Sequence, residues 1–270
     1  MKIDELHDKL FKMWRMFDEI CKANNITYFF DSGSLLGAVR EHDFIPWDDD
    51  IDVAVEREEY ERLKKVFNKC LPAKYKFIEP KDFAPYFFDF VPKLIDTTVP
   101  LRSETAEDRA YHNYQNRMSI DFFILDSVPN AKWRQSFIRL KSKVFYGFAR
   151  SNRYAIHEAD MSFSEKALSR TAAVLGKCIS LNRALSLYEH NTTRFADIQS
   201  DYFIRSNSLL YFIDFYKKSD YAGVVYLPFH GDRVPAPVGY DAILKQMYGD
   251  YMTPKRHYKG YISHTDPNGN

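Results

Sequence analysis

Residues 46–52 hold the densest group of chemically useful side chains in the sequence. Four carboxylates fall within five positions, at Asp48, Asp49, Asp50 and Asp52, directly before an apolar run. Residues two apart share one face of an extended strand, so we expect Asp48, Asp50 and Asp52 to point the same way. Three like charges this close repel each other strongly unless a cation neutralises them. Oxygen ligands of this kind suit Mg²⁺ or Mn²⁺, and the competing interpretation is a solvated acidic loop.

A short Gly-Ser turn precedes the acidic run. Residues 26–30 are rich in β-branched and aromatic side chains and predict a strand, 31–34 predict a turn, and 35–40 predict a helix. Free backbone N–H groups at the start of such a helix can bind phosphate oxygens. A Gly-Ser turn alone is usually only a turn. The acidic strand that follows makes Gly33 and Ser34 candidate phosphate-binding residues.

A further carboxylate interrupts an apolar strand downstream. Asp121 lies in the otherwise apolar run from Ile120 to Leu125. A buried acid is unfavourable unless it is paired or bound to a metal. Asp121 is therefore either a strand-end carboxylate satisfied by the backbone or an arginine, or a third metal ligand.

These motifs together resemble the LicD family, which comprises bacterial phosphocholine transferases related to the eukaryotic fukutin proteins. The family belongs to the DNA polymerase β-like nucleotidyltransferases. The resemblance extends from about residue 28 to residue 252, nearly the whole chain. The blocks that carry it are FDSGSLLGAVR (30–40), FIPWDDDID (44–52), SIDFFILD (119–126), LPFH (227–230) and YGDYM (248–252).

The chain departs from the family pattern beside the phosphate turn. Where the family usually has Gly-Gly-Ser or Gly-Gly-Thr, this chain has Ser32-Gly33-Ser34, and where it has Arg-His this chain has Arg40-Glu41. Asp43 replaces a common glycine. These differences leave the acidic positions unchanged and bear on which group is transferred.

The resemblance implies a role for each acidic residue. Asp50 and Asp52 would hold the metal that accompanies the donor nucleotide. Asp121 would bind a second metal or accept the proton of the attacking hydroxyl. Asp48 would support the metal through water, and Asp49 should face away.

Two cations are expected to contact the donor phosphates. Arg40 directly follows the helix after the phosphate turn, and Lys93 lies in the strand-like run 90–95 between the acidic strands. For each of them a surface salt bridge is the alternative. With Gly33 and Ser34 they would complete a donor site.

The resemblance also implies the substrates. The donor would be CDP-choline or a related CDP-alcohol, and the acceptor a hydroxyl of a lipid-linked glycan precursor for teichoic acid, lipopolysaccharide or capsule. The hydroxyl would attack the β-phosphorus and CMP would leave. A choline head needs an aromatic cage, for which Tyr86, Tyr111, Tyr248 and Tyr251 are candidates. The alternatives are a CDP-glycerol or CDP-ribitol phosphotransferase, a metal-dependent nucleotide-sugar glycosyltransferase and a catalytically silent binding protein.

The net charge and the cysteines limit which partners the protein is expected to bind and in which compartment it is expected to lie. A formal net charge of +1 argues against general binding of nucleic acid. The three cysteines are widely spaced, which predicts reduced thiols in a cytoplasmic protein and no zinc site. No apolar run approaches the ~20 residues that cross a bilayer. We therefore expect a cytoplasmic enzyme that is soluble or peripheral on the inner face of the cell membrane.

The apolar periodicity predicts a single α/β (α+β) domain over 1–270. A mixed-sheet nucleotidyltransferase core should occupy about 24–128, and helices of about 129–270 should surround it. Helices are expected at 4–23, 57–71, 130–149, 163–190, 201–218 and 239–248, further strands near 75–79, 86–95 and 119–125, and a loop over 103–116.

One predicted helix has an unusual composition. From Lys132 to Arg153 the chain carries seven basic residues, interleaved with aromatic and aliphatic ones, and no acid. This pattern suits the surface of an anionic membrane. The alternative is a helix that packs its apolar side on the core and leaves its basic face in solvent.

Overall fold

The central element is a mixed β-sheet that includes seven described strands. The computed structural model describes residues 1–155, 179–205, 207 and 215–253. The sheet order is β1-β2-β5-β4-β3, and β6 pairs with the far part of β5 and with β7. Its strands are β1 (Phe29–Phe30), β2 (Ile51–Glu56), β3 (Tyr75–Ile78), β4 (Lys93–Pro100), β5 (Arg117–Val128), β6 (Tyr202–Arg205) and β7 (Phe215–Lys217). A separate hairpin joins β8 (Val224–Phe229) to β9 (Asp232–Pro237).

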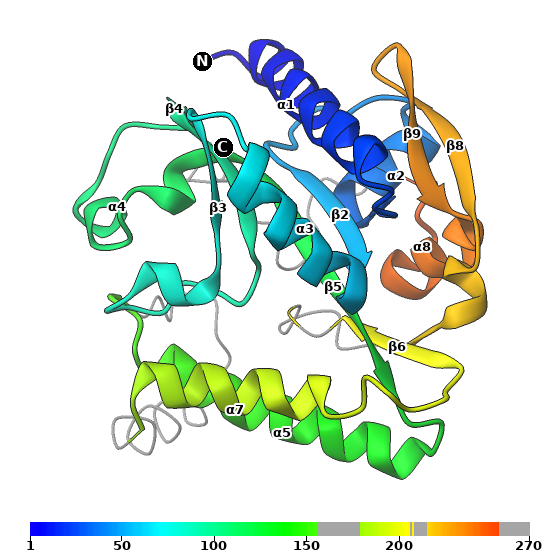
Figure 1. Cartoon of the computed structure of the whole chain (residues 1–270). Helices are drawn as coiled ribbons and strands as arrows, with labels where there is room; N and C mark the ends of the chain where they lie inside the picture. Colours follow the sequence, from blue (N-terminus) through cyan, green and yellow to red (C-terminus); the bar gives the residue numbers. More distant parts are fainter. Residues whose placement is uncertain (156–178, 206, 208–214, 254–270) are drawn as a thin grey trace.

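Seven α-helices are described around this sheet (Figure 1). They are α1 (Ile3–Ala23), α2 (Ser32–Arg40), α3 (Arg57–Cys70), α4 (Ala106–Ala110), α5 (Lys132–Arg150), α7 (Leu181–Thr193) and α8 (Tyr240–Tyr248). Helices α5 and α7 run side by side along the bottom of Figure 1. No helix within the described ranges combines the length and the apolar character needed to cross a membrane.

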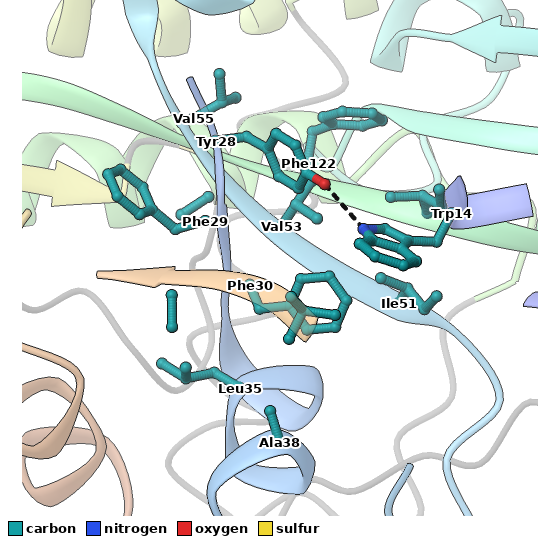
Figure 2. Close-up of a cluster of buried hydrophobic side chains, with 14 of the residues drawn as sticks. Trp14, Tyr28, Phe29, Phe30, Leu35, Ala38, Ile51, Val53, Val55 and Phe122 are labelled. Atoms are coloured by element: carbon teal, nitrogen blue, oxygen red, sulfur yellow. Dashed lines mark hydrogen bonds between the residues drawn. The ribbon is translucent and has the colours of Figure 1, made fainter. Parts of the chain in front are cut away.

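The main core fills one face of the sheet. Successive strand residues point to opposite faces, so Ile51 and Val53 of β2 share a face with their β5 partners Ile120 and Phe122. Helices α1 and α3 cover this face: the Phe17 ring lies 5.5 Å from that of Phe122. Figure 2 shows the same cluster, in which the Trp14 indole donates a hydrogen bond to Tyr28.

The opposite face of the same strands is polar. The parallel register of β2 and β5 sets Asp52 beside Asp121, and the antiparallel register of β4 and β5 sets Lys93 on the other side of Asp121. Alternation therefore buries the apolar residues under α1 and turns the charged ones to the other side.

Much of the predicted fold is confirmed. The mixed α/β content agrees with the structure, and the helices expected at 4–23, 57–71, 130–149 and 239–248 are α1, α3, α5 and α8. The division of the chain into domains stays a prediction.

The second half of the chain is less helical than predicted. The helix expected at 201–218 is wrong, because 202–205 and 215–217 are β6 and β7 of the main sheet. The aromatic and β-branched side chains of β6 fit a half-buried strand. Of the helix expected at 163–190, residues 181–190 lie in α7, and 163–178 lie outside the described residues.

The boundaries near the acidic run also differ from the prediction. Strand β2 begins at Ile51, so Asp48 and Asp50 precede the strand. Helix α2 begins at Ser32, so the turn expected at 31–34 is the helix N-cap and first turn. A helix is favoured there because the Asp31 carboxylate caps it by accepting from the Ser32 N–H.

Two further segments were predicted incorrectly. Residues 86–92 of the strand expected at 86–95 are irregular, and β4 begins only at Lys93. Pro92 cannot donate a ladder hydrogen bond, which explains why the strand does not start earlier. The loop expected at 103–116 contains α4 and a short 3₁₀ turn.

A buried ion pair joins β6 to the start of α2. Arg205 is 1% exposed, and its guanidinium donates to the Asp31 carboxylate and, at 2.7 Å, to the Ser32 hydroxyl. The guanidinium carbon also lies 4.4 Å from the centre of the Phe123 ring. A strand late in the sequence thereby stabilises the helix N-terminus that borders the acidic residues.

We predict that Arg205→Met lowers the free energy of unfolding by about 3–5 kcal/mol, because it leaves the Asp31 carboxylate buried without its cation. Urea denaturation measures the loss. Arg15→Met is the control, since the Arg15–Asp232 pair is exposed and should contribute less than about 1 kcal/mol. Equal, small losses in the two variants would contradict the proposal that the Arg205–Asp31 ion pair stabilises the fold.

Candidate active site

Three carboxylates converge on the polar face of the sheet. Oxygens of Asp50, Asp52 and Asp121 all lie within 4.8 Å of one another. Asp52 and Asp121 are held by the parallel pairing of β2 and β5, and Asp50 by the turn that enters β2. The structure thus brings together the three residues for which the sequence predicted a metal role. Three clustered hard oxygen donors fit Mg²⁺ or Mn²⁺, with sites left for waters and phosphate oxygens.

The electrostatics of this cluster disfavour its ionised form. Burial raises the pKa of Asp52 well above its usual range, and the charges of Asp50, Asp48 and Asp121 raise it further. Burial, followed by Asp50 and Asp49, likewise raises the pKa of Asp48. A divalent cation bound among these groups would reverse the effect by favouring the carboxylates.

The N-terminus of α2 lies against the same carboxylates. The Gly33 N–H donates to Asp52 Oδ2 at 3.1 Å, and the Ser34 hydroxyl accepts from the Asp52 N–H at 2.9 Å. A Cβ at Gly33 would lie 2.6 Å from Asp48 Oδ2, so only glycine fits there without a shift. In this structure both residues position the acidic cluster, and their binding of donor phosphates stays a prediction.

Asp48 lies beside Asp52 although it is not on the strand. Its carboxylate approaches Gly33, as that of Asp52 does. The His7 ring is within 2.8 Å of the Asp48 carbonyl and stacks on Phe44 at 4.3 Å, which holds the acidic turn against α1. Asp49, expected to face away, is buried and lies outside the three-carboxylate cluster.

Lys93 compensates the charge of Asp121. Its ammonium donates to Asp121 Oδ2, and the Ser119 hydroxyl donates to Oδ1 at 2.7 Å. Burial lowers the pKa of Lys93, but Asp121 and Asp89 outweigh this effect and keep its pKa above the ordinary value. Lys93 is therefore a buried cation beside the cluster, paired with a carboxylate, and its contact with donor phosphates stays a prediction.

Arg40 is not brought to the cluster. It lies at the C-terminal end of α2, where it donates to the Glu41 carboxylate at 2.6 Å and to the Tyr251 carbonyl at 3.3 Å. It follows Gly33 by seven positions, about 10 Å along the helix axis. The alternative expected was a surface salt bridge, and Arg40 does form an ion pair, but its side chain is only 8% exposed.

The sequence alone did not identify two residues near the site, Asp89 and Arg205. Burial and the charge of Asp121 raise the pKa of Asp89, while Lys93 opposes them, so these three groups act on one another. Asp89 lies among Phe87, Phe88 and Phe90, the same signal of an acid in an apolar run that identified Asp121. Arg205 gave no such signal, because a lone arginine has no local pattern.

Of the four candidate tyrosines, Tyr248 is the one coupled to the acidic cluster. Burial raises its pKa, and the charges of Asp52, Asp31 and Asp48 add to that rise. The other three have different partners: Tyr86 and Tyr111 pack on one another at 6.3 Å, and the Tyr251 hydroxyl donates to Asp241. Tyr86 and Tyr111 lie in one hydrophobic cluster and Tyr248 and Tyr251 in another, and a role for any of them in binding a choline head stays a prediction.

Comparison with known proteins matches a family model over more than half of the chain and a relative over most of it. The LicD/FKTN/FKRP nucleotidyltransferase domain matches residues 25–169. The lipopolysaccharide cholinephosphotransferase LicD of Haemophilus influenzae is 27% identical over 249 residues, covering 87% of this chain and 86% of that protein. Uncharacterized proteins of Rickettsia prowazekii and Rickettsia typhi are 39% and 42% identical over only 57 and 50 residues, 21% and 18% of this chain. They cover 21% and 16% of those proteins.

We predict that Mn²⁺ or Mg²⁺ raises the thermal stability of the wild type and does not raise that of Asp52→Asn or Asp50→Asn. A cation at about a hundred times its Kd would add about 2.7 kcal/mol to the free energy of unfolding. Without metal, both variants should be at least as stable as the wild type at neutral pH, because each removes one repelling charge.

The matched control is Glu19→Gln, which removes an exposed carboxylate from the later part of α1, away from its N-terminal turn. It should leave both the metal-free stability and the metal-induced shift unchanged. A full shift in Asp52→Asn and Asp50→Asn would exclude the cluster as the metal site.

Proposed function

This chain belongs to the LicD family of nucleotidyltransferase-domain phosphotransferases, and from that membership we propose that it transfers phosphocholine from CDP-choline to a hydroxyl of a cell-surface glycan precursor. The observation that carries the proposal is the convergence of Asp50, Asp52 and Asp121 at the N-terminus of α2. The relative in Haemophilus influenzae is named for choline phosphate and lipopolysaccharide, and we extend both to this chain as a proposal.

The chemistry follows from where the charges lie. In the transfer, the acceptor oxygen forms a bond to the β-phosphorus, the bond from that phosphorus to the bridging oxygen breaks, and CMP leaves with the bonding electrons. A divalent cation held by Asp50, Asp52 and Asp121 would neutralise phosphate charge. We assign Asp121 the further role of accepting the hydroxyl proton, because Lys93 and Ser119 orient its carboxylate.

The proposed location is the cytoplasm, at the inner face of the cell membrane, where a lipid-linked glycan precursor would serve as acceptor. The two described cysteines, Cys21 and Cys70, are free thiols, in keeping with a reducing compartment. Lipopolysaccharide, teichoic acid and capsule are the acceptor classes to be tested.

The direct test measures CMP release and donor-dependent stabilisation. With Mg²⁺, CDP-choline should raise the melting temperature and release CMP when an acceptor glycan is added. CDP-glycerol and CDP-ribitol test the neighbouring head groups, and UDP-sugars test the glycosyltransferase alternative. A response to UDP-sugars alone would overturn the proposal, and binding without turnover towards any acceptor would favour a silent binding protein.

We predict that Gly33→Ala lowers kcat/KM for the donor by about a hundredfold, because the added Cβ displaces the Asp48 carboxylate and disturbs the cluster geometry. Steady-state CMP release measures the effect. Gly223→Ala is the matched control, since a Cβ there meets Val238 only at 3.9 Å. Wild-type kinetics in Gly33→Ala would remove the helix N-terminus from the mechanism.

A further inference from the structure

Helix α5 has two apolar faces, of which one is explained by the fold. Its buried side chains include Tyr146 and Ala149, which build a small core with α7, and Ile138, which packs with Val128 and Ile204. Asn191 of α7 donates to the Ile138 carbonyl at 3.0 Å, which binds the two helices together. The packing of this face agrees with one interpretation of the sequence, a helix that packs its apolar side on the core.

The other face exposes large apolar side chains. Trp133 is 70% exposed, Phe137 48%, Leu140 58% and Val144 44%. These are four of the ten large apolar side chains found exposed among the described residues. At 100° per residue they fall within about 60° of arc, opposite the buried face. Their clustering makes this a continuous stripe, unlike the scattered exposed apolar residues that are normal on a surface.

Cations border the stripe on both sides. By helical position, Arg134 and Lys141 lie along one edge, and Lys132 and Lys143 along the other. The Lys141 ammonium lies 4.5 Å from the centre of the Phe137 ring, and the Arg134 guanidinium 5.2 Å from that of Trp133. Within the described ranges, no carboxylate forms a salt bridge with any of these four cations.

We propose that this face of α5, defined by Trp133, Phe137, Leu140 and Val144 with their flanking cations, docks the protein on an anionic lipid bilayer. The apolar stripe would enter the boundary between headgroups and acyl chains, and the cations would contact lipid phosphates. Cations on both edges without an acid match a uniformly anionic surface. An exposed Trp beside cations is the side-chain combination typical of the membrane interface.

This docking deepens the proposed function by naming the surface from which a lipid-linked acceptor is reached, and to that extent it rests on that function. The lipid contact itself depends only on α5. Binding to vesicles and CMP release are therefore separate measurements, and either can fail without the other.

The first experiment is vesicle flotation of the full chain at low salt. The protein should float with vesicles containing phosphatidylglycerol, bind pure phosphatidylcholine at least about tenfold more weakly, and be released by added salt. Trp133 reports the geometry, because Trp14 is buried and Trp47 half-buried. Its fluorescence should shift to the blue on binding, and Trp133→Phe should keep flotation and lose most of that shift.

Matched variants test whether vesicle binding depends on the α5 stripe or on other parts of the surface. Lys141→Glu with Lys143→Glu should weaken vesicle binding by about tenfold or more, while Lys12→Glu with Lys65→Glu, the same charge change on α1 and α3, should have little effect. Phe137→Ser with Leu140→Ser should likewise release the protein. Its control is Tyr226→Ser with Val238→Ser, which are 49% and 50% exposed on or beside the β8–β9 hairpin.

Three outcomes would overturn the proposal. The first is that the protein fails to float with anionic vesicles at low salt. The second is that it floats equally well after the α5 substitutions. The third is that it forms a dimer, which the Phe137→Ser, Leu140→Ser variant abolishes and which lipid does not affect. The last would assign the stripe to a second copy of the chain. CMP release from CDP-choline with a soluble acceptor should be unchanged in the α5 variants, and its absence from the wild type would count against the proposed function alone.

Discussion

Mutual repulsion among buried carboxylates is the constraint on which the rest of this structure depends. Asp48, Asp52 and Asp121 are buried beside the partly exposed Asp50, and burial and the neighbouring charges together raise the pKa of Asp48 and Asp52. Nothing in the packing of the apolar face requires such a cluster. The surrounding elements hold the charges in place: paired strands, a helix N-terminus and a buried lysine.

Compensation of this charge is uneven across the cluster. On the β4 side, Lys93 and Ser119 both donate to Asp121. On the α2 side, the Gly33 N–H donates to Asp52, and the positive end of the helix dipole adds to that contact. Asp50 enters from the preceding turn and is more exposed than Asp52 and Asp121.

The local parts of this site could be predicted from sequence, because they depend on short motifs. The acidic run, the Gly-Ser segment and the acid in an apolar strand are each visible within ten residues, and they led to Asp50, Asp52, Asp121 and Gly33. The aromatic run around Asp89 carried the same signal and was not used. The strand register that sets Asp52 beside Asp121 depends on the tertiary structure and cannot be read from the spacing of the motifs along the sequence.

Long-range contacts explain what the sequence missed. Residues 202–205 form a strand because an edge of β5 is available, and their helix-compatible spacing could not reveal that partner. Arg205 pairs with Asp31, more than 170 residues away in the sequence. Arg40 likewise donates a hydrogen bond to the carbonyl of Tyr251, a residue far from it in the sequence. The exposed stripe of α5 was suggested by composition, but only the packing of α7 determines which apolar face remains uncovered.

The most direct test of the central claim is anomalous diffraction at the manganese edge from crystals grown with Mn²⁺ and CDP-choline. The account predicts a strong peak within coordination distance of Asp50, Asp52 and Asp121, with donor phosphate oxygens completing the coordination sphere near the N-terminus of α2. A bound donor with no manganese at these three carboxylates, or manganese bound at another site, would contradict it.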